Sequence, residues 1–248
     1  MSALLEVQGL TKSFGALRAL DGVDFDAAEG ALTGLIGPNG AGKSTAFNCI
    51  SGATVPSGGS VRYRGRELSG TAYHHVARLG VARTYQVVQP FGDMSVLEAT
   101  TVGALLRRPR LSSAIAYATE IVAFVGLDDK QHRLGRTLSI ADKKRLEVAR
   151  ALATDPALLL LDEVMAGLTP AECRSAVDLL KRILQRGVTI VMVEHVMEVL
   201  MPLANHVVVI AAGRTIFAGP AAAAVSDRAV IEAYLGAPRD HREFGADR

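Results

Sequence analysis

The sequence predicts an α/β fold built on a mainly parallel sheet, and three apolar segments carry this prediction. Residues 157–161 and 188–193 form two almost entirely apolar runs that end in acidic residues, which is typical of strands buried on both faces. Residues 31–36 form a third, short run, which passes through a glycine-rich loop into a helical stretch, 43–51. Hydrophobic residues make up 49% of the 248 residues, enough for one large domain with a substantial core.

Composition and charge argue against several classes of protein. The net charge is +2, so no strong field recruits nucleic acid, and we expect no nucleic-acid partner. The two cysteines, Cys49 and Cys173, are far apart and in no metal-binding spacing, which predicts reduced core thiols in a cytosolic protein. The N-terminus lacks the pattern of a signal peptide, and no run of about 18 apolar residues occurs. Any work at a membrane is therefore expected to require a partner.

The glycine-rich loop fits the phosphate-binding motif G-x-x-x-x-G-K-[ST] without a mismatch. The motif and the residue after it are Gly37, Pro38, Asn39, Gly40, Ala41, Gly42, Lys43, Ser44 and Thr45. The glycines let successive N–H groups point into one concavity, and the helix N-terminus adds partial positive charge. Lys43 is expected to reach the β- and γ-phosphates, and the Ser44 hydroxyl to coordinate Mg²⁺. The loop therefore predicts binding of a nucleoside triphosphate with Mg²⁺.

Polar residues follow the two long apolar runs, at the edge where parallel α/β sheets bind their ligands. Asp162 and Glu163 follow the first run. Glu194 follows the second run, and His195 comes directly after it. A buried carboxylate without a partner is costly, so Asp162 requires a cation or donors, and Mg²⁺ is the candidate. A lone histidine is usually structural, but the predicted position of His195 at the same edge as Gly37 favours a functional role.

The rest of the chain predicts one domain, residues 1–236, followed by a loose tail, 237–248. Residues 4–10 and 18–26 have the patterns of strands, and we expect a helical subdomain at roughly 90–152. No linker separates two independent domains.

The helical region is expected to begin with a capping box, because Glu98 follows Ser95 by three residues. The basic run 107–110 interrupts it, either as a solvated loop or as a face for anionic lipid headgroups, and the loop is favoured. Two further helices are predicted, at 139–153 and 170–186.

Taken together, these motifs resemble those of the ATP-binding-cassette (ABC) transporter ATPase family over nearly the whole chain. The phosphate loop resembles the family's Walker A motif, and residues 158–163 resemble its Walker B motif with the catalytic glutamate. The resemblance implies a P-loop NTPase cassette with a RecA-like, mainly parallel core sheet. It also implies an N-terminal antiparallel β subdomain and an α-helical subdomain.

The resemblance assigns roles to individual residues. Gln86 is similar to the Q-loop glutamine and Asp162 to the Walker B aspartate, which would bind Mg²⁺ together with the Walker A serine. Glu163 and His195 are similar to the catalytic glutamate and the switch histidine. From its position alone, Phe14 is either an adenine-stacking aromatic or an ordinary core or edge phenylalanine; the family pattern favours stacking.

The greatest departure from the family lies in its signature, Leu-Ser-Gly-Gly-Gln. Ser139, Ile140, Ala141 and Asp142 stand in that place, which in the family faces the ATP of a second cassette. Glycine permits close backbone approach, which Ala141 hinders, and the carboxylate of Asp142 opposes a phosphate. Thr169 stands where the family's D-loop usually has an acidic residue. We hypothesise a competent Walker site and a weak signature, as in a heterodimer with unequal sites; a homodimer is the alternative.

Within the family, the chain is most similar to the cassettes of branched-chain amino acid importers of the LivG type. This similarity rests on residues 82–86, 145–150, 166–168 and 230–236. It implies a motor subunit that hydrolyses ATP, peripheral to the cytoplasmic face of the membrane. Its expected partners are a second cassette, two transmembrane permease subunits and a solute-binding protein. The alternatives are the ATPase of a lipid or lipopolysaccharide exporter and, from another class, a soluble ABC ATPase or a regulatory ATP-binding scaffold.

Overall fold

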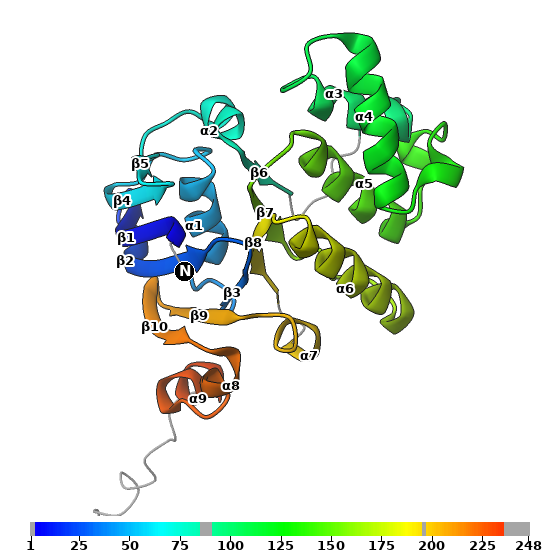
Figure 1. Cartoon of the computed structure of the whole chain (residues 1–248). Coiled ribbons are helices and arrows are strands. Elements are labelled where there is room, and N and C mark those ends of the chain that lie inside the picture. The colour runs from blue at the N-terminus through cyan, green and yellow to red at the C-terminus, as the bar shows by residue number, and fades with distance from the viewer. Residues whose placement is uncertain (1–2, 85–90, 195–196, 236–248) are drawn as a thin grey trace, which may run out of the picture.

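Two sheets and a group of helices make up the structure, a computed structural model that describes residues 3–84, 91–194 and 197–235. The larger sheet has the strand order β10-β9-β3-β8-β7-β6 (Figure 1). From β9 to β6 all neighbours run parallel, and β10 pairs antiparallel with β9 at the edge. Its strands are β3 (Leu32–Ile36), β6 (Val81–Arg83), β7 (Leu158–Asp162), β8 (Thr189–Val193), β9 (His206–Ala211) and β10 (Arg214–Gly219). The predicted α/β fold with a mainly parallel sheet is confirmed.

The N-terminal part of the chain forms a second, antiparallel sheet in the order β2-β1-β4-β5. Its strands are β1 (Ala3–Phe14), β2 (Leu17–Ala28), β4 (Gly58–Tyr63) and β5 (Arg66–Glu67). β1 and β2 are longer than predicted, because they form a hairpin in which Phe14 pairs with Leu17 across a tight turn. This sheet is the antiparallel β region that the sequence implied.

Some of the helices form a cluster, and the others lie at separate places around the two sheets (Figure 1). Helices α3 (Val96–Ala104), α4 (Leu111–Phe124) and α5 (Ile140–Ala153) lie together, to one side of the sheets. The others are α1 (Lys43–Ile50), α2 (Tyr73–Leu79), α6 (Pro170–Gln185), α7 (Met197–Leu200), α8 (Ala221–Ala224) and α9 (Arg228–Leu235). Ser95 and Glu98 form the predicted capping box at the start of α3. Throughout the described ranges, each helix is too short or too polar to span a bilayer.

Strand β7 shows how the central sheet is buried on both faces. Leu159 and Leu161 belong to the core that includes residues of α5 and α6. Leu158 and Leu160 belong to the core shared with α1 and the antiparallel sheet. All four side chains are fully buried, and each stabilises the fold by about 1.5–3 kcal/mol. This double burial holds Asp162, the last residue of β7, and Glu163 after it at the carboxyl edge of the sheet.

Candidate functional site

The phosphate loop joins β3 to α1, and two of its positions accept only glycine. A Cβ atom on Gly37, whose φ is +149°, would lie 2.0 Å from the backbone oxygen of Ile210. A Cβ atom on Gly42, whose φ is +105°, would lie 2.7 Å from the backbone oxygen of Ala19. These close backbone approaches explain why the sequence has glycine there, because any side chain would displace the loop from β9 and β2.

Lys43, the first residue of α1, folds back onto the loop. Its ammonium donates to the carbonyl oxygens of Gly37 at 2.8 Å and Pro38 at 3.0 Å. Burial lowers the pKa of Lys43, and the nearby carboxylates of Glu163 and Asp162 act in the opposite direction. The ammonium therefore lies in the loop, with both acidic residues at the end of β7 close enough to interact with it.

A cavity of about 840 Å³ contains the loop. It is lined by Asn39 to Thr45, by Phe14, Leu17 and Ala19 of the β1–β2 hairpin, and by Glu163. Half of the Phe14 surface is exposed, and the ammonium of Lys12 lies 4.9 Å from its ring centroid. Phe14 is thus not a core residue, and its ring lies at the wall of the same cavity as the phosphate loop.

Asp162, the last residue of β7, forms a buried ion pair that the sequence analysis missed. Its Oδ2 accepts a hydrogen bond from Nη2 of Arg83 at 2.9 Å, and both side chains are at most 5% exposed. Nη1 of Arg83 also donates to Oδ1 of Asn48 at 2.6 Å and lies 3.4 Å from Oγ of Ser51. We expected a cation for Asp162 and named Mg²⁺, but Arg83 supplies one cation. The signal was an arginine in the otherwise apolar strand that became β6.

The other oxygen of Asp162 has a different environment. Oδ1 is buried and accepts no hydrogen bond from any residue that the structure describes. The Asp162 backbone N–H donates to Oγ1 of Thr84 at 3.2 Å. One carboxylate oxygen is thus engaged by Arg83, and the other has unused acceptor capacity. Such an orphaned acceptor fits a site completed by a metal ion or its water ligands.

Glu163 follows in a strained backbone conformation at the cavity wall. Its φ is +50°, in the left-handed region that side chains other than glycine seldom adopt. The Glu163 N–H donates to the carbonyl of Val193 at 2.9 Å, and its own carbonyl accepts from the ammonium of Lys144 at 2.7 Å. Two residues on, the N–H of Met165 donates to Oε1 of buried Glu194 at 2.8 Å. The turn after β7 is therefore fastened to the end of β8 and to α5.

The residues in the signature position begin α5 at an exposed edge. The Ser139 side chain caps the helix by accepting from the N–H of Asp142, and 61% of the Ile140 surface is exposed. Both carboxylate oxygens of Asp142 lie 3.0 Å from the ammonium of Lys130, and its Oδ2 accepts from the Ser139 hydroxyl at 2.8 Å. The negative charge of Asp142, which we expected to oppose a phosphate, is therefore neutralised within the chain.

Burial raises the pKa of Asp142, but hydrogen bonds from Lys130 and Ser139 outweigh it and leave this pKa below its ordinary value. Thr169, the departure in the D-loop, likewise has a local role. It caps α6 in a capping box with Glu172. Two predicted site residues, Gln86 and His195, lie outside the described residues.

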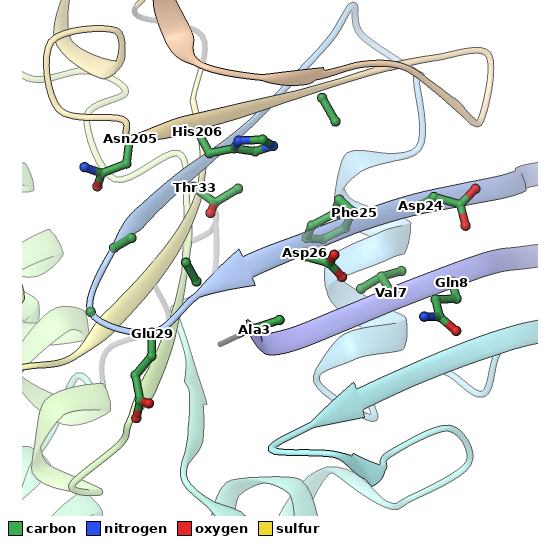
Figure 2. A pocket seen from close by; sticks show the side chains of 14 residues that line it. Ala3, Val7, Gln8, Asp24, Phe25, Asp26, Glu29, Thr33, Asn205 and His206 are labelled. Atoms are coloured by element: carbon green, nitrogen blue, oxygen red, sulfur yellow. The ribbon is translucent and has the colours of Figure 1, made fainter. Parts of the chain in front are cut away.

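A second cavity, of about 790 Å³, lies at the opposite edge of the parallel sheet, where β3 and β9 begin (Figure 2). Its lining includes Asp24, Asp26, Glu29 and His206, but no lysine or arginine. Oδ1 of Asp24 accepts from the N–H of Gly9 at 2.6 Å, so this carboxylate joins β2 to β1. Ligands of parallel sheets bind at the carboxyl edge, and the phosphate loop with its lysine is there. The candidate site is therefore the cavity at the phosphate loop.

Comparison with known proteins agrees with this site. Residues 20–166 match the family model described as ABC transporter. The chain is 36% identical to the high-affinity branched-chain amino acid transport ATP-binding protein BraF of Pseudomonas aeruginosa, an alignment that covers 94% of this chain and 98% of the relative. It is 34% identical, with the same coverage, to the corresponding protein LivG of Escherichia coli.

Two solved structures are similar over nearly their full length. A nucleotide-free ATP-binding cassette from an ABC transporter has a TM-score of 0.87 and 27% identity, over 95% of this chain and 100% of that one. An ATP-binding cassette of an ABC transporter in its ADP conformation has a TM-score of 0.86 and 28% identity, over 96% and 100%. The fold, the phosphate-loop cavity and these relatives agree: the chain belongs to the ABC transporter family, as one of its ATPase cassettes.

Proposed function

We propose that this chain is the ATP-hydrolysing motor subunit of an importer for branched-chain amino acids or related amino-acid or amide solutes. The assignment of ATP hydrolysis rests on one observation: Phe14, the phosphate loop and Glu163 line the same cavity. The solute class rests on the relatives BraF and LivG, which are named as branched-chain amino acid transport proteins and match over 94% of this chain.

ATP binding is assigned to the phosphate loop and to Phe14. The N–H groups of the loop and the N-terminus of α1 are placed to hold the phosphates of ATP. Lys43 now donates to the carbonyls of Gly37 and Pro38, and it would exchange these bonds for the β- and γ-phosphates. The half-exposed ring of Phe14 is available to stack on adenine.

The residues near the loop suit a magnesium ion. Ser44 lines the cavity, and Oδ1 of Asp162 is the buried acceptor without a partner among the described residues. We assign Mg²⁺ to Ser44 and, through water, to Asp162, with Gln86 as a further ligand proposed from the sequence. Bound Mg²⁺ would neutralise charge that develops on the phosphates. Because Arg83 engages Oδ2, it directs the remaining oxygen of Asp162 toward that role.

Hydrolysis is assigned to Glu163 as general base. Glu163 lines the cavity that contains Lys43, and its carboxylate interacts electrostatically with the Lys43 ammonium, which supports a role in taking a proton from a water that attacks the γ-phosphate. The fastening of its backbone to Val193 and Lys144 restricts where that carboxylate lies. We propose that His195 contacts the γ-phosphate; this role rests on the sequence.

Ser139 to Asp142 are proposed to face the nucleotide of a second cassette. Lys130 neutralises Asp142, so the obstacles to close approach that remain in this segment are the side chains of Ile140 and Ala141, which stand where the family has glycine. We propose a heterodimer with unequal ATP sites, bound to two transmembrane permease subunits at the cytoplasmic face of the membrane, with a solute-binding protein in the full complex. Closure of the dimer on ATP and its opening after hydrolysis would drive the permeases.

The test is purification of the tagged full chain from detergent-solubilised membranes, with identification of its partners by mass spectrometry. Recovery of two permease subunits, a second cassette and a solute-binding protein is expected, and the binding protein then allows the solute to be identified by direct binding of amino acids. Recovery of exporter subunits would replace the importer by a lipid or lipopolysaccharide exporter. A bait that is wholly soluble and brings no membrane protein would refute both transport assignments.

A further inference from the structure

Lys144 joins the helix that begins at the signature to the turn that holds Glu163. It lies on the first turns of α5, four residues after Ile140 and three after Ala141. Its ammonium donates to the backbone carbonyl of Glu163 at 2.7 Å. Residues at these spacings lie on one face of a helix. Ile140, Ala141 and Lys144 therefore share a face at the start of α5, and the hydrogen bond to Glu163 comes from that face.

The backbone of Glu163 needs such support. A left-handed conformation at a residue other than glycine costs about 1–3 kcal/mol and persists only where the surroundings hold it. The Glu163 N–H is held by the carbonyl of Val193, and its carbonyl by Lys144 and, at 3.3 Å, by the N–H of Ala166. Of these three hydrogen bonds, the one from Lys144 comes from α5 and has a charged donor. Lys144 thus contributes to holding the peptide after Glu163 in its orientation.

The surroundings of Lys144 favour a fixed position for its ammonium. Burial lowers its pKa, and the carboxylates of Glu194 and Glu163 act in the opposite direction. On the other side, Lys144 lines a small cavity of about 30 Å³ with Arg145 of its own helix, Glu172 of α6 and Met165. A partly buried lysine whose nearest acceptor is a main-chain carbonyl is an anchor, since little space remains for other rotamers.

We propose that Lys144 is a positioning residue for ATP hydrolysis: by holding the Glu163 carbonyl, it keeps the Glu163 carboxylate aimed into the nucleotide cavity. The proposal rests on the assignment of Glu163 as general base. It also gives the signature end of α5 a direct connection to the base of this chain's own ATP site. Lys144 does not line the phosphate-loop cavity, and its ammonium contacts the main chain of the turn.

The test compares Lys144→Met, Lys144→Arg and the control Lys143→Met in the complex purified with the tagged full chain. Lys144→Met keeps the apolar stem of the side chain and removes the hydrogen-bond donor. Without the donor the Glu163 carboxylate is expected to be misplaced, and a misplaced catalytic group can slow a reaction about 100-fold. We expect kcat to fall about 10- to 100-fold with KM for ATP changed less than twofold. Lys144→Arg retains a donor and is expected to recover most of the rate. Lys143→Met removes the same charge from the same helix and is expected to leave kcat within twofold.

A double variant separates positioning from general packing. In the Glu163→Gln background the base is already gone, so Lys144→Met is expected to slow hydrolysis less than twofold further. An equal loss of rate in both backgrounds, or a wild-type rate for Lys144→Met, would overturn the proposal. If Lys144→Met melts below the assay temperature, Lys144→Gln takes its place in the same cycle. A wild-type rate for Glu163→Gln alone would instead refute the assignment of the base.

Discussion

The guanidinium of Arg83 and the carboxylate of Asp162 form an ion pair of 2.9 Å in which both side chains are buried. The pair joins β6 to β7, and Asn48 and Ser51 bring α1 into the same network. Because Arg83 engages Oδ2, Oδ1 of Asp162 is left buried without a hydrogen-bond partner among the described residues. One arginine therefore connects the helix of the phosphate loop to the acidic residue at the end of β7.

Removing Arg83 is expected to destabilise the protein strongly. Arg83→Gln leaves the Asp162 charge buried without its partner, and breaking a buried pair in this way costs about 3–5 kcal/mol. Arg62→Gln is the matched control, because Arg62 and Glu67 form a half-exposed pair at 3.5 Å, a type worth at most about 1 kcal/mol. Urea denaturation of both variants measures the difference. Equal losses in the free energy of unfolding would show that the buried pair contributes no more than the exposed one.

The ion pair between Lys130 and Asp142 predicts a dependence of stability on acid. The pKa of Asp142 lies below its ordinary value of 3.8 in the folded chain, so its charge stabilises the fold at neutral pH. This contribution is present above about pH 4 and is lost as the pH falls through the lowered pKa. The stability gap between wild type and Asp142→Asn should therefore shrink below pH 4 in denaturant titrations. Asp129→Asn is the control, because Asp129 is exposed and adjacent to Lys130 in the chain. The difference in stability between wild type and Asp129→Asn should be small at every pH.

Phe14 is expected to contribute to nucleotide affinity. Stacking of a base on an aromatic ring is worth about 1–3 kcal/mol, so Phe14→Ala should weaken ATP binding between about fivefold and 150-fold, and Phe14→Tyr should restore it. Calorimetric titration with ATP measures this. Phe91 is exposed to a similar extent but stacks with Arg150 in the helical region, so Phe91→Ala should leave the affinity unchanged. An unchanged affinity in Phe14→Ala would remove Phe14 from the nucleotide site.

Glu163→Gln is expected to slow hydrolysis while ATP still binds. General-base catalysis is worth about 10²–10⁴-fold, so the turnover rate should fall by that factor. Glu120→Gln, which changes an exposed carboxylate on α4, is the control and should hydrolyse at the wild-type rate. Phosphate release and ATP binding are measured in parallel on the purified complex. Loss of ATP binding in Glu163→Gln would indicate a structural role for this carboxylate instead.

Restoring the family signature is expected to raise the ATPase rate of the assembled complex. Ala141→Gly removes the Cβ atom that we propose to hinder close approach to the nucleotide of a second cassette, and Asp142→Gln removes the acidic side chain. Because Lys130 already neutralises Asp142, most of the gain should come from Ala141→Gly. The two single variants and the double variant are compared by phosphate release. A double variant with the wild-type rate would refute the hypothesis of a weak signature.

Local patterns in the sequence predicted most of the fold and the position of the glycine-rich loop. The loop from Gly37 to Ser44, the capping box of Ser95 and Glu98 and the buried run of β7 depend on neighbours in the chain, and the structure has each of them at the predicted position. The boundaries were less well predicted, since β1 and β2 extend beyond their periodic segments through pairing with each other. Residues 197–200, which form α7, were not predicted as a helix.

The sequence by itself determined the parallel α/β fold, the glycine-rich loop between β3 and α1, and the place of Asp162 and Glu163 at the end of a buried strand, because backbone geometry and burial depend on short-range sequence patterns. Only the tertiary structure decided which side chains meet across the fold. Arg83 reaches Asp162 over 79 positions, and Lys144 reaches Glu163 over 19. Such pairs depend on how strands and helices pack. Two charged residues that are distant in the chain cannot be paired from the sequence, because no local pattern relates one to the other.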